Sequence, residues 1–158
     1  FETAKELKDC QFVLCGDGDY LSGLKNKTQG LDNVFFPGWV DRPKIEVLSD
    51  ISIASLAPYK NIDNFMVNTP NKIVDSLLLG LPIISPLRGE VAKLIESNEV
   101  GFTYDDSRSL NNHIQLLIND DKLQEQMSNN AKKLYNKEFE FNMVYDGLVQ
   151  HLERMVGK

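Results

Sequence analysis

The stretch Asn68–Ser85, NTPNKIVDSLLLGLPIIS, decides the fold of this chain. Pro70 favours the first helical position, where its missing N–H costs no hydrogen bond, and the hydroxyl of Thr69 can cap the same end. Gly80 favours the left-handed conformation that ends many helices. The apolar run Ile83–Ser85 that follows is typical of a short buried strand. A helix, a glycine stop and an apolar strand in this order predict one unit of an α/β domain.

The start of this helix has the features of an anion-binding site. The first N–H groups of a helix have no acceptor within it, and the helix dipole adds positive potential there. Lys72 contributes a full positive charge at this end, and Asp75 lies about one turn further along. Helical side chains lean back toward the N-terminus, so Asp75 can reach hydroxyls of a ligand whose phosphate rests on the helix start. A phosphate next to a diol indicates a nucleotide.

Length and composition fit a single domain with one core. The 158 residues are 42% hydrophobic, and the net charge of −6 argues against a nucleic-acid surface, which needs a basic field. Cys10 and Cys15 are expected to be buried reduced thiols rather than a disulfide or a metal pair. The sequence contains no apolar run of membrane-spanning length and no signal peptide, so we expect a cytoplasmic protein.

Strands and helices are expected to alternate along the whole chain. We expect strands at 11–15, 33–36, 51–55, 83–85 and 101–104, helices at 20–28, 43–48, 70–79 and 90–97, and a helical tail from 107 to 156 with breaks near 119–120 and 137–138. Apolar strands separated by helices predict a doubly wound, Rossmann-like parallel sheet with helices on both faces. We therefore expect residues 1–158 to form one Rossmann-like domain with a helical C-terminal tail.

A ligand site is expected in the loops after the strands, because ligands of such folds bind at the carboxyl ends of the strands. Gly16 opens the turn GDGD, which can cradle phosphate or serve only as a tight turn, since the third glycine of a dinucleotide fingerprint is missing. Trp39 can border a base or simply pack. Arg88 can face a phosphate, pair with Glu90 or point into solvent. The connection 56–68 is longer than most, which is typical of functional loops.

Other kinds of chemistry find little support in the sequence. His113 and His151 lie in the helical tail without cysteine or carboxylate partners at ligand spacing, so we expect packing or surface roles and no metal site. No Ser-His-Asp or Cys-His arrangement is recognisable. The sequence assigns no catalytic residue.

The chain resembles the C-terminal half of GT-B glycosyltransferases of the family-4 type, the group 1 glycosyl transferases. The resemblance extends over residues 11–102 and is most specific in PNKIVDSLLLGLPII (70–84) and GEVAKLI (89–95). It implies a retaining transferase of surface-polysaccharide assembly, in which this half binds the nucleotide of the sugar donor. By the same resemblance, Asp75 binds the ribose hydroxyls.

The resemblance also extends to the neighbouring groups of the site. It implies that the backbone of Pro70, Asn71 and Lys72 meets the diphosphate and that main-chain groups of the loop 38–41 meet the base. Together with the residues chosen from the loops, the candidate nucleotide-binding set is Gly16, Trp39, Val40, Asp41, Thr69, Pro70, Asn71, Lys72, Asp75 and Arg88. No cofactor or metal is expected.

The chain departs from the family pattern at several positions. Of the two glutamates spaced E-x7-E in many members, the first falls on Val67 and the second is the shorter Asp75, so the hexose would be held differently. The family's basic pair follows the first strand of this domain, which would precede Phe1. We therefore expect that strand, its loop and the N-terminal acceptor domain to lie outside residues 1–158, and the chain alone to be inactive.

The function expected from these features is transfer of a hexosyl group from a nucleotide-diphosphate sugar to a saccharide or lipid-linked acceptor. UDP-sugar is the expected donor in preference to GDP-sugar, without a metal. Acceptor binding, and any contact with the inner face of a membrane, would belong to the N-terminal half. The alternative is a non-catalytic nucleotide-binding or receiver-type module. A receiver needs an aspartate after its third strand, where this chain has Leu56-Ala57-Pro58.

Overall fold

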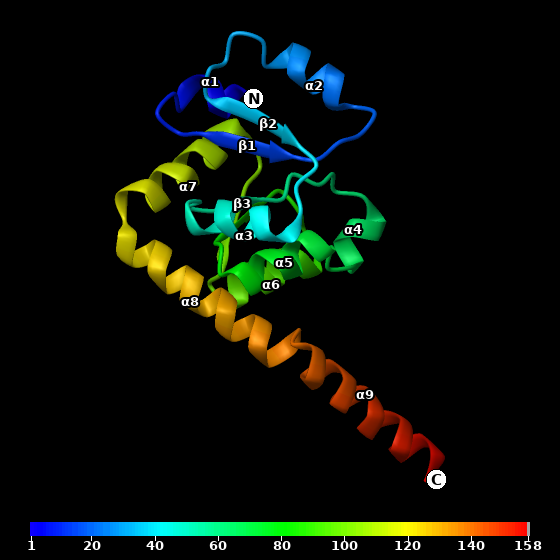
Figure 1. Ribbon diagram of the computed structural model, residues 1–158. Helices are drawn as coiled ribbons and strands as arrows, with labels where there is room; N and C mark the ends of the chain where they lie inside the picture. Colours follow the sequence, from blue (N-terminus) through cyan, green and yellow to red (C-terminus); the bar gives the residue numbers. More distant parts are fainter. Residues whose placement is uncertain (158) are drawn as a thin grey trace.

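The computed structural model describes residues 1–157 and consists of short parallel strands alternating with helices (Figure 1). In chain order the elements are α1 (Glu2–Glu6), β1 (Phe12–Cys15), α2 (Leu21–Lys27), β2 (Val34–Gly38), α3 (Arg42–Asp50), β3 (Ser55–Leu56), α4 (Asp63–Val67), α5 (Asn71–Leu79), β4 (Ile83–Ser85), α6 (Glu90–Ser97), β5 (Gly101–Thr103), α7 (Ser107–Asn119), α8 (Asp121–Glu138) and α9 (Phe141–Val156). This order confirms the predicted Rossmann-like α/β class with a helical tail.

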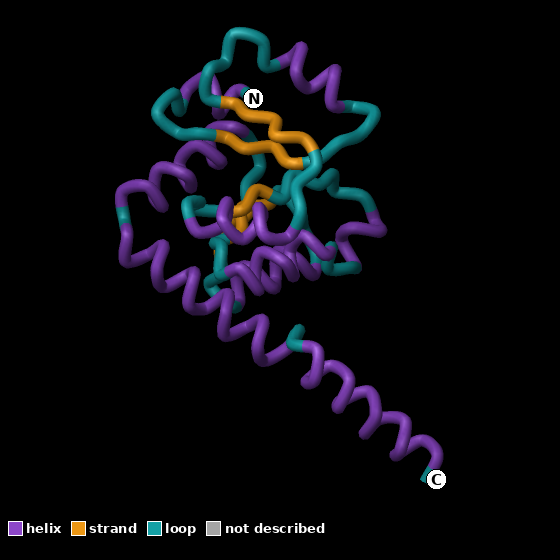
Figure 2. Tube along the Cα trace, viewed as in Figure 1, coloured by secondary structure: helices purple, strands orange, loops and turns teal. Residues whose placement is uncertain are grey.

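The strands form two parallel sheets. β1 pairs with β2, with Phe12 opposite Val34, and β4 lies between β3 and β5, with Ile83 opposite both Ser55 and Gly101. Figure 2 shows the two groups of strands apart from each other. One continuous sheet was expected; within residues 1–157 no ladder joins β1 to β3.

Two apolar clusters hold the elements together. The first joins α5, α6 and α8 around β4 through fully buried side chains that include Ile73, Leu77, Ile83 and Ile95. The second consists of Ile84, Ile114, Leu117 and Met127, with Phe12 and Leu56 packed against it. Each fully buried aliphatic side chain contributes about 1.5–3 kcal/mol. Both clusters include a residue of β4, which is buried throughout.

The connection between α3 and α5 differs most from the prediction. The strand expected at 51–55 is only Ser55–Leu56, because α3 runs to Asp50 and its last turn takes up the next two residues. The hydroxyl of Ser52 donates to the carbonyl of Leu48 (2.6 Å) and its N–H to that of Ser49 (3.1 Å). The expected long loop after β3 contains the short helix α4.

The helical tail runs along one side of the domain and ends in a projecting helix. The first break falls at Asp120, as predicted, and the second at 139–140 rather than 137–138. Glu140 caps α9 by accepting from the N–H of Met143 (3.1 Å). Figure 1 shows α9 extending away from the other elements, and none of its side chains is buried. Among residues 1–157, no helix combines the length and apolarity that crossing a bilayer requires.

Candidate nucleotide-binding site

Helix α5 begins with an open end. Pro70 is the N-cap residue and not the first helical residue, and no side chain caps the helix, so the predicted Thr69 cap is wrong. Pro70 is extended (φ −62°, ψ 146°), and the first helical bond runs from the N–H of Ile73 to its carbonyl (2.9 Å). The N–H groups of Asn71 and Lys72 therefore precede the helical ladder. They are available to an anionic ligand.

The far end of α5 is closed by glycine, as predicted. Gly80 adopts φ 68°, the left-handed conformation, and its N–H donates to the carbonyl of Leu77 (3.1 Å). A Cβ at this position would lie 2.3 Å from Cε of Lys132 on α8. The helix is thus held firmly at its C-terminal end while its N-terminal end stays uncapped.

Lys72 reaches from α5 toward the end of β1. Lys72 is exposed as a residue. Desolvation of its ammonium group by the surrounding protein nevertheless lowers the pKa of Lys72, and the negative charge of a Cys15 thiolate would raise it in part. Desolvation likewise raises the pKa of Cys15, and the charge of Lys72 lowers it in part. Cys15 is exposed, so the prediction of a buried thiol is wrong for it, whereas Cys10 is half-buried. The alternation along β1 directs Cys15 to the open face of the strand.

Asp75 lies on the exposed side of α5, and its charge influences the phenol of Tyr59, which follows β3. Desolvation raises the pKa of the Tyr59 phenol, and the negative charge of Asp75 raises it further. The Tyr59 ring packs against Phe65 of α4, with 4.9 Å between ring centroids. Sequence reasoning did not select Tyr59; its place in the long connection after a strand is the signal that could have done so.

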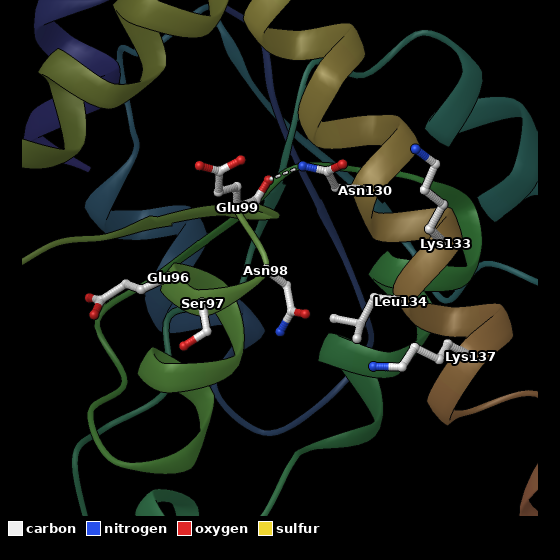
Figure 3. Close-up of a pocket in the computed structure, with 8 residues that line it drawn as sticks. All are labelled: Glu96, Ser97, Asn98, Glu99, Asn130, Lys133, Leu134 and Lys137. Atoms are coloured by element: carbon white, nitrogen blue, oxygen red, sulfur yellow. Dashed lines mark hydrogen bonds between the residues drawn. The ribbon is translucent and has the colours of Figure 1, made fainter.

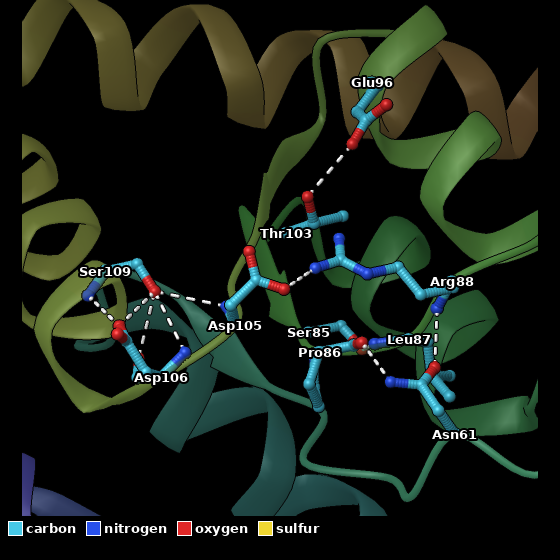
Figure 4. A network of polar contacts seen from close by, with 10 residues as sticks. All are labelled: Asn61, Ser85, Pro86, Leu87, Arg88, Glu96, Thr103, Asp105, Asp106 and Ser109. Atoms are coloured by element: carbon cyan, nitrogen blue, oxygen red, sulfur yellow. Dashed lines mark hydrogen bonds and ion pairs between the residues drawn. The ribbon is translucent and has the colours of Figure 1, made fainter.

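Arg88 belongs to a polar network between the loops that follow β3, β4 and β5 (Figure 4). The guanidinium of Arg88 forms an ion pair with Asp105. The backbone N–H of Arg88 donates to Oδ1 of Asn61 (2.8 Å). The Asn61 amide in turn donates to the carbonyl of Pro86 (2.8 Å). The considered pairing with Glu90 is not formed, because Glu90 bonds to Lys93 (2.7 Å). Asn61 is a further residue that sequence reasoning missed.

Gly89 allows α4 to approach the start of α6. Its φ of 70° is in the left-handed region, and a Cβ would lie 2.3 Å from the carbonyl oxygen of Met66. Only glycine fits this position without movement of the backbone. The contact fixes the segment before α5 over the N-terminal end of α6.

The loops after β1 and β2 meet through their backbones. The N–H of Gly16 donates to the carbonyl of Gly38 (2.8 Å), so this N–H is already used within the protein. Trp39 is 72% exposed and Val40 is half-buried. Asp41 caps α3 by accepting from the N–H of Lys44 (3.3 Å). These four candidates thus lie at the carboxyl ends of β1 and β2.

A surface groove of about 390 Å³ lies elsewhere, between the end of α6 and α8 (Figure 3). Glu96 and Glu99 line one side, and Lys133 and Lys137 line the other. None of the candidate nucleotide-binding residues lines this groove. In the part of the chain that the structure describes, no group of three or more His, Cys, Asp or Glu side chains could hold a metal ion.

Comparison with known proteins bears on the family and the fold. Residues 1–134 match the family model described as glycosyl transferases group 1. The chain belongs to this family. A comparison with curated proteins found no match.

Solved structures similar to this group 1 glycosyl transferase chain are GT-B glycosyltransferases. HepE from Anabaena, in complex with UDP, has a TM-score of 0.73 at 22% identity over 96% of this chain and 44% of its own. Sucrose-phosphate synthase from Thermosynechococcus elongatus has a TM-score of 0.78 at 17% identity over 99% and 42%. WaaG, a glycosyltransferase involved in lipopolysaccharide biosynthesis, has a TM-score of 0.67 at 14% identity over 92% of this chain and 41% of its own. The chain spans less than half the length of these proteins, and the likeness shows the fold.

Proposed function

We propose that this chain is the donor-binding half of a retaining glycosyltransferase of surface-polysaccharide synthesis. It would bind the nucleotide of an NDP-sugar, and the complete enzyme would transfer the hexosyl group to a saccharide or lipid-linked acceptor held by an N-terminal domain. Family membership favours this function over a receiver-type module. Structures of one neighbour, HepE, contain UDP or UDP-glucose, which supports a UDP-sugar donor.

The observation that carries the proposal is the open end of α5 with two charged side chains of opposite sign. The N–H groups of Asn71 and Lys72 and the Lys72 ammonium offer positive potential to a diphosphate. Asp75 lies one turn further on the same helix and is exposed, so its carboxylate can accept hydrogen bonds from the ribose diol. Trp39 is exposed at the end of β2 and can border the base.

The same groups suit the proposed reaction. When the glycosidic bond to the diphosphate breaks, negative charge develops on the leaving group. A helix N-terminus and a lysine are fixed before the reaction and can stabilise this charge without a metal ion. The hexose would be held without the first acid of the family pattern, because Val67 stands in its place and is exposed.

Calorimetric titration of the protein with UDP, GDP and ADP tests the proposal. We expect UDP to bind best, with about −4 to −5 kcal/mol, corresponding to a Kd in the millimolar to sub-millimolar range. EDTA should leave the affinity unchanged. Absence of binding to all three nucleotides, or binding that EDTA abolishes, would contradict the proposal.

A second experiment tests the division of labour between the two halves. Residues 1–158 should not turn over any nucleotide sugar, whereas a longer polypeptide that also contains the acceptor domain should release nucleotide in the presence of acceptor. Turnover by residues 1–158 alone would show that the acceptor half is not needed.

A further inference from the structure

Two serine hydroxyls link the first turn of α5 to β3. Oγ of Ser76 lies 2.7 Å from the carbonyl oxygen of Lys72 and 2.8 Å from Oγ of Ser55. Ser76 belongs to α5 and is 3% exposed, and Ser55 is the first residue of β3. This chain of contacts therefore runs from a strand of the sheet to Lys72, the lysine of the candidate site.

The direction of the two hydrogen bonds follows from the chemistry of the groups. A hydroxyl has one proton to donate, whereas a carbonyl oxygen can only accept. The Ser76 hydroxyl therefore donates to the carbonyl of Lys72, and the Ser55 hydroxyl donates to Oγ of Ser76. Because Ser76 is buried, water does not readily replace a bond that is lost there.

The backbones of both serines are anchored to the start of β4. The N–H of Ser55 donates to the carbonyl of Pro82 (2.8 Å), which directly precedes β4. The carbonyl of Ser76 accepts from the N–H of Leu81 (2.9 Å), in the turn after α5. The two hydroxyls thus connect a well-anchored part of the domain with the uncapped end of α5.

The first turn of α5 has few other attachments. No side chain caps it, and Asn71 and Lys72 are exposed, whereas the side chain of Ile73 is fully buried. Burial of Ile73 holds the turn against the core without a preferred direction, because the hydrophobic effect is non-directional. Hydrogen bonds depend on angle as well as distance, so the serine chain restricts how the turn can rotate.

We infer that Ser55 and Ser76 are positioning residues of the candidate site, which fix the direction of the free N–H groups at the start of α5. Neither serine would touch the ligand, and both act through the carbonyl of Lys72. Donors that are already aimed at a diphosphate need no reordering when it binds. The inference rests on the proposed function, because it assigns the diphosphate to this end of α5.

Amide hydrogen exchange followed by NMR tests whether the serines hold the first turn. Ser76→Ala removes both bonds, and Ser55→Ala removes only the bond from β3. In either variant the N–H of Ile73, which donates to the carbonyl of Pro70 (2.9 Å), should exchange about tenfold faster than in the parent. The N–H of Leu81 should keep its parental rate, because its bond uses the backbone of Ser76 and not the hydroxyl.

Nucleotide binding tests whether this positioning matters to the ligand. NMR titration with UDP and with uridine separates the diphosphate from the nucleoside. Both variants should bind UDP about threefold to tenfold more weakly than the parent and uridine equally well, because only the diphosphate uses the start of α5. Ser55→Ala should have no further effect in the Ser76→Ala background, since Ser55 acts through Ser76.

Two further variants serve as controls. Ser52→Ala is the matched control, because the Ser52 hydroxyl also donates to the carbonyl four residues earlier (2.6 Å), at the end of α3. It should leave both the exchange of Ile73 and the binding of UDP unchanged. Ser55→Thr keeps the hydroxyl on a strand, where a β-branched residue is favoured, and should behave like the parent.

Two results would overturn the inference. If the N–H groups of Ile73 and Leu81 accelerate by the same factor, the serines stabilise the whole fold and not the start of α5. If Ile73 alone accelerates while UDP binds as in the parent, the direction of this turn does not matter to the diphosphate. A parent that binds no UDP would instead contradict the proposed function, and the exchange rates would still confirm or refute that the serines hold the first turn.

Discussion

Lys72 on the first turn of α5 and Cys15 at the end of β1 lie near enough that the charge of each shifts the pKa of the other. The carboxyl end of β1 therefore lies near the open end of α5. A diphosphate held at α5 would therefore lie beside the Cys15 thiol. The thiol becomes a reporter of both the lysine charge and the ligand.

The first prediction concerns this thiol. Lys72→Met removes the positive charge that lowers the pKa of Cys15, so less thiolate is present at about pH 8 and alkylation by iodoacetamide should slow. Lys72→Arg keeps the charge and should react at close to the parental rate. The measurement is made in a Cys10→Ala background, because the half-buried Cys10 is the second thiol. UDP at saturation should also slow alkylation; equal rates with and without UDP would place the nucleotide elsewhere.

The second prediction concerns Asp75. Loss of a charge-assisted hydrogen bond costs about 1.5–3 kcal/mol, so Asp75→Ala should weaken UDP binding about tenfold to a hundredfold. Asp75→Asn should lose part of this affinity, and Asp75→Glu should retain most of it because the carboxylate is kept. Calorimetry in the full-length protein gives the affinities.

Folding stability separates this role from a purely structural one. An acidic residue near a helix N-terminus stabilises the helix by up to about 1 kcal/mol. Asp121→Ala, in the first turn of α8, is the matched control and should change stability by a similar small amount without affecting UDP. If Asp75→Ala binds UDP like the parent, the ribose is not held by this carboxylate.

The fold was predictable wherever a local signal coincides with packing. Gly80 ends α5 in the left-handed conformation that its position indicated, and Ile83–Ser85 is the buried strand that its apolar run indicated. The boundaries of β3 were not predictable, because Ile51 carries a strand-forming side chain but is taken up, together with Ser52, by the last turn of α3. The division into two sheets was not predictable from the residues of any one strand.

The residues of the candidate site differ in how far the sequence alone selects them, and their part in nucleotide binding stays a prediction. Lys72 and Asp75 could be selected from helix geometry alone, since both follow from the start of α5. The Thr69 cap failed because Pro70 itself is the N-cap residue. Asn61 and Tyr59 could not be selected, because their partners, Arg88 and Asp75, come from other elements and meet them only in the folded chain.

The third prediction concerns the close approach at Gly89. Gly89→Ala places a Cβ against the carbonyl of Met66 at a positive φ, and should lower the free energy of unfolding by about 1–3 kcal/mol. Gly23→Ala is the matched control, because Gly23 lies within α2 with open space around it. In a helix this change should stabilise by about 0.5–1 kcal/mol. Urea unfolding of both variants gives the comparison, and equal stabilities would refute the contact.

The fourth prediction concerns α9. Its apolar side chains, including Phe141, Leu148 and Leu152, are about half exposed or more, and none of its residues is buried. Ending the chain after Glu140 should therefore change the unfolding free energy by less than about 1 kcal/mol. The same truncation should reduce binding of the dye ANS, which reports exposed apolar surface. A large loss of stability would show that α9 packs on the domain in solution.

The last prediction concerns His113, whose ring stacks on Phe102 with 4.4 Å between centroids and 7° between planes. Desolvation lowers the pKa of His113 below its ordinary value, and a hydrogen bond involving the backbone of Thr103 opposes this only in part. Below about pH 6.5, His113 therefore binds a proton more readily in the unfolded chain than in the folded chain. Stability from this group is complete above about pH 6.5 and declines as the pH falls toward the lower pKa of the folded state.

Urea unfolding at about pH 7.5 and about pH 5.5 measures this effect as a difference between variants. His113→Phe keeps an aromatic ring against Phe102 and removes the titrating group, so it should lose less stability than the parent between the two pH values. His151→Phe is the matched control, because it makes the same replacement at the exposed histidine of α9. Taking the difference cancels the carboxylates, which titrate in every variant alike. If His113→Phe follows the parental pH dependence, folding does not lower the pKa of His113, and its stacking on Phe102 does not disfavour the charged form.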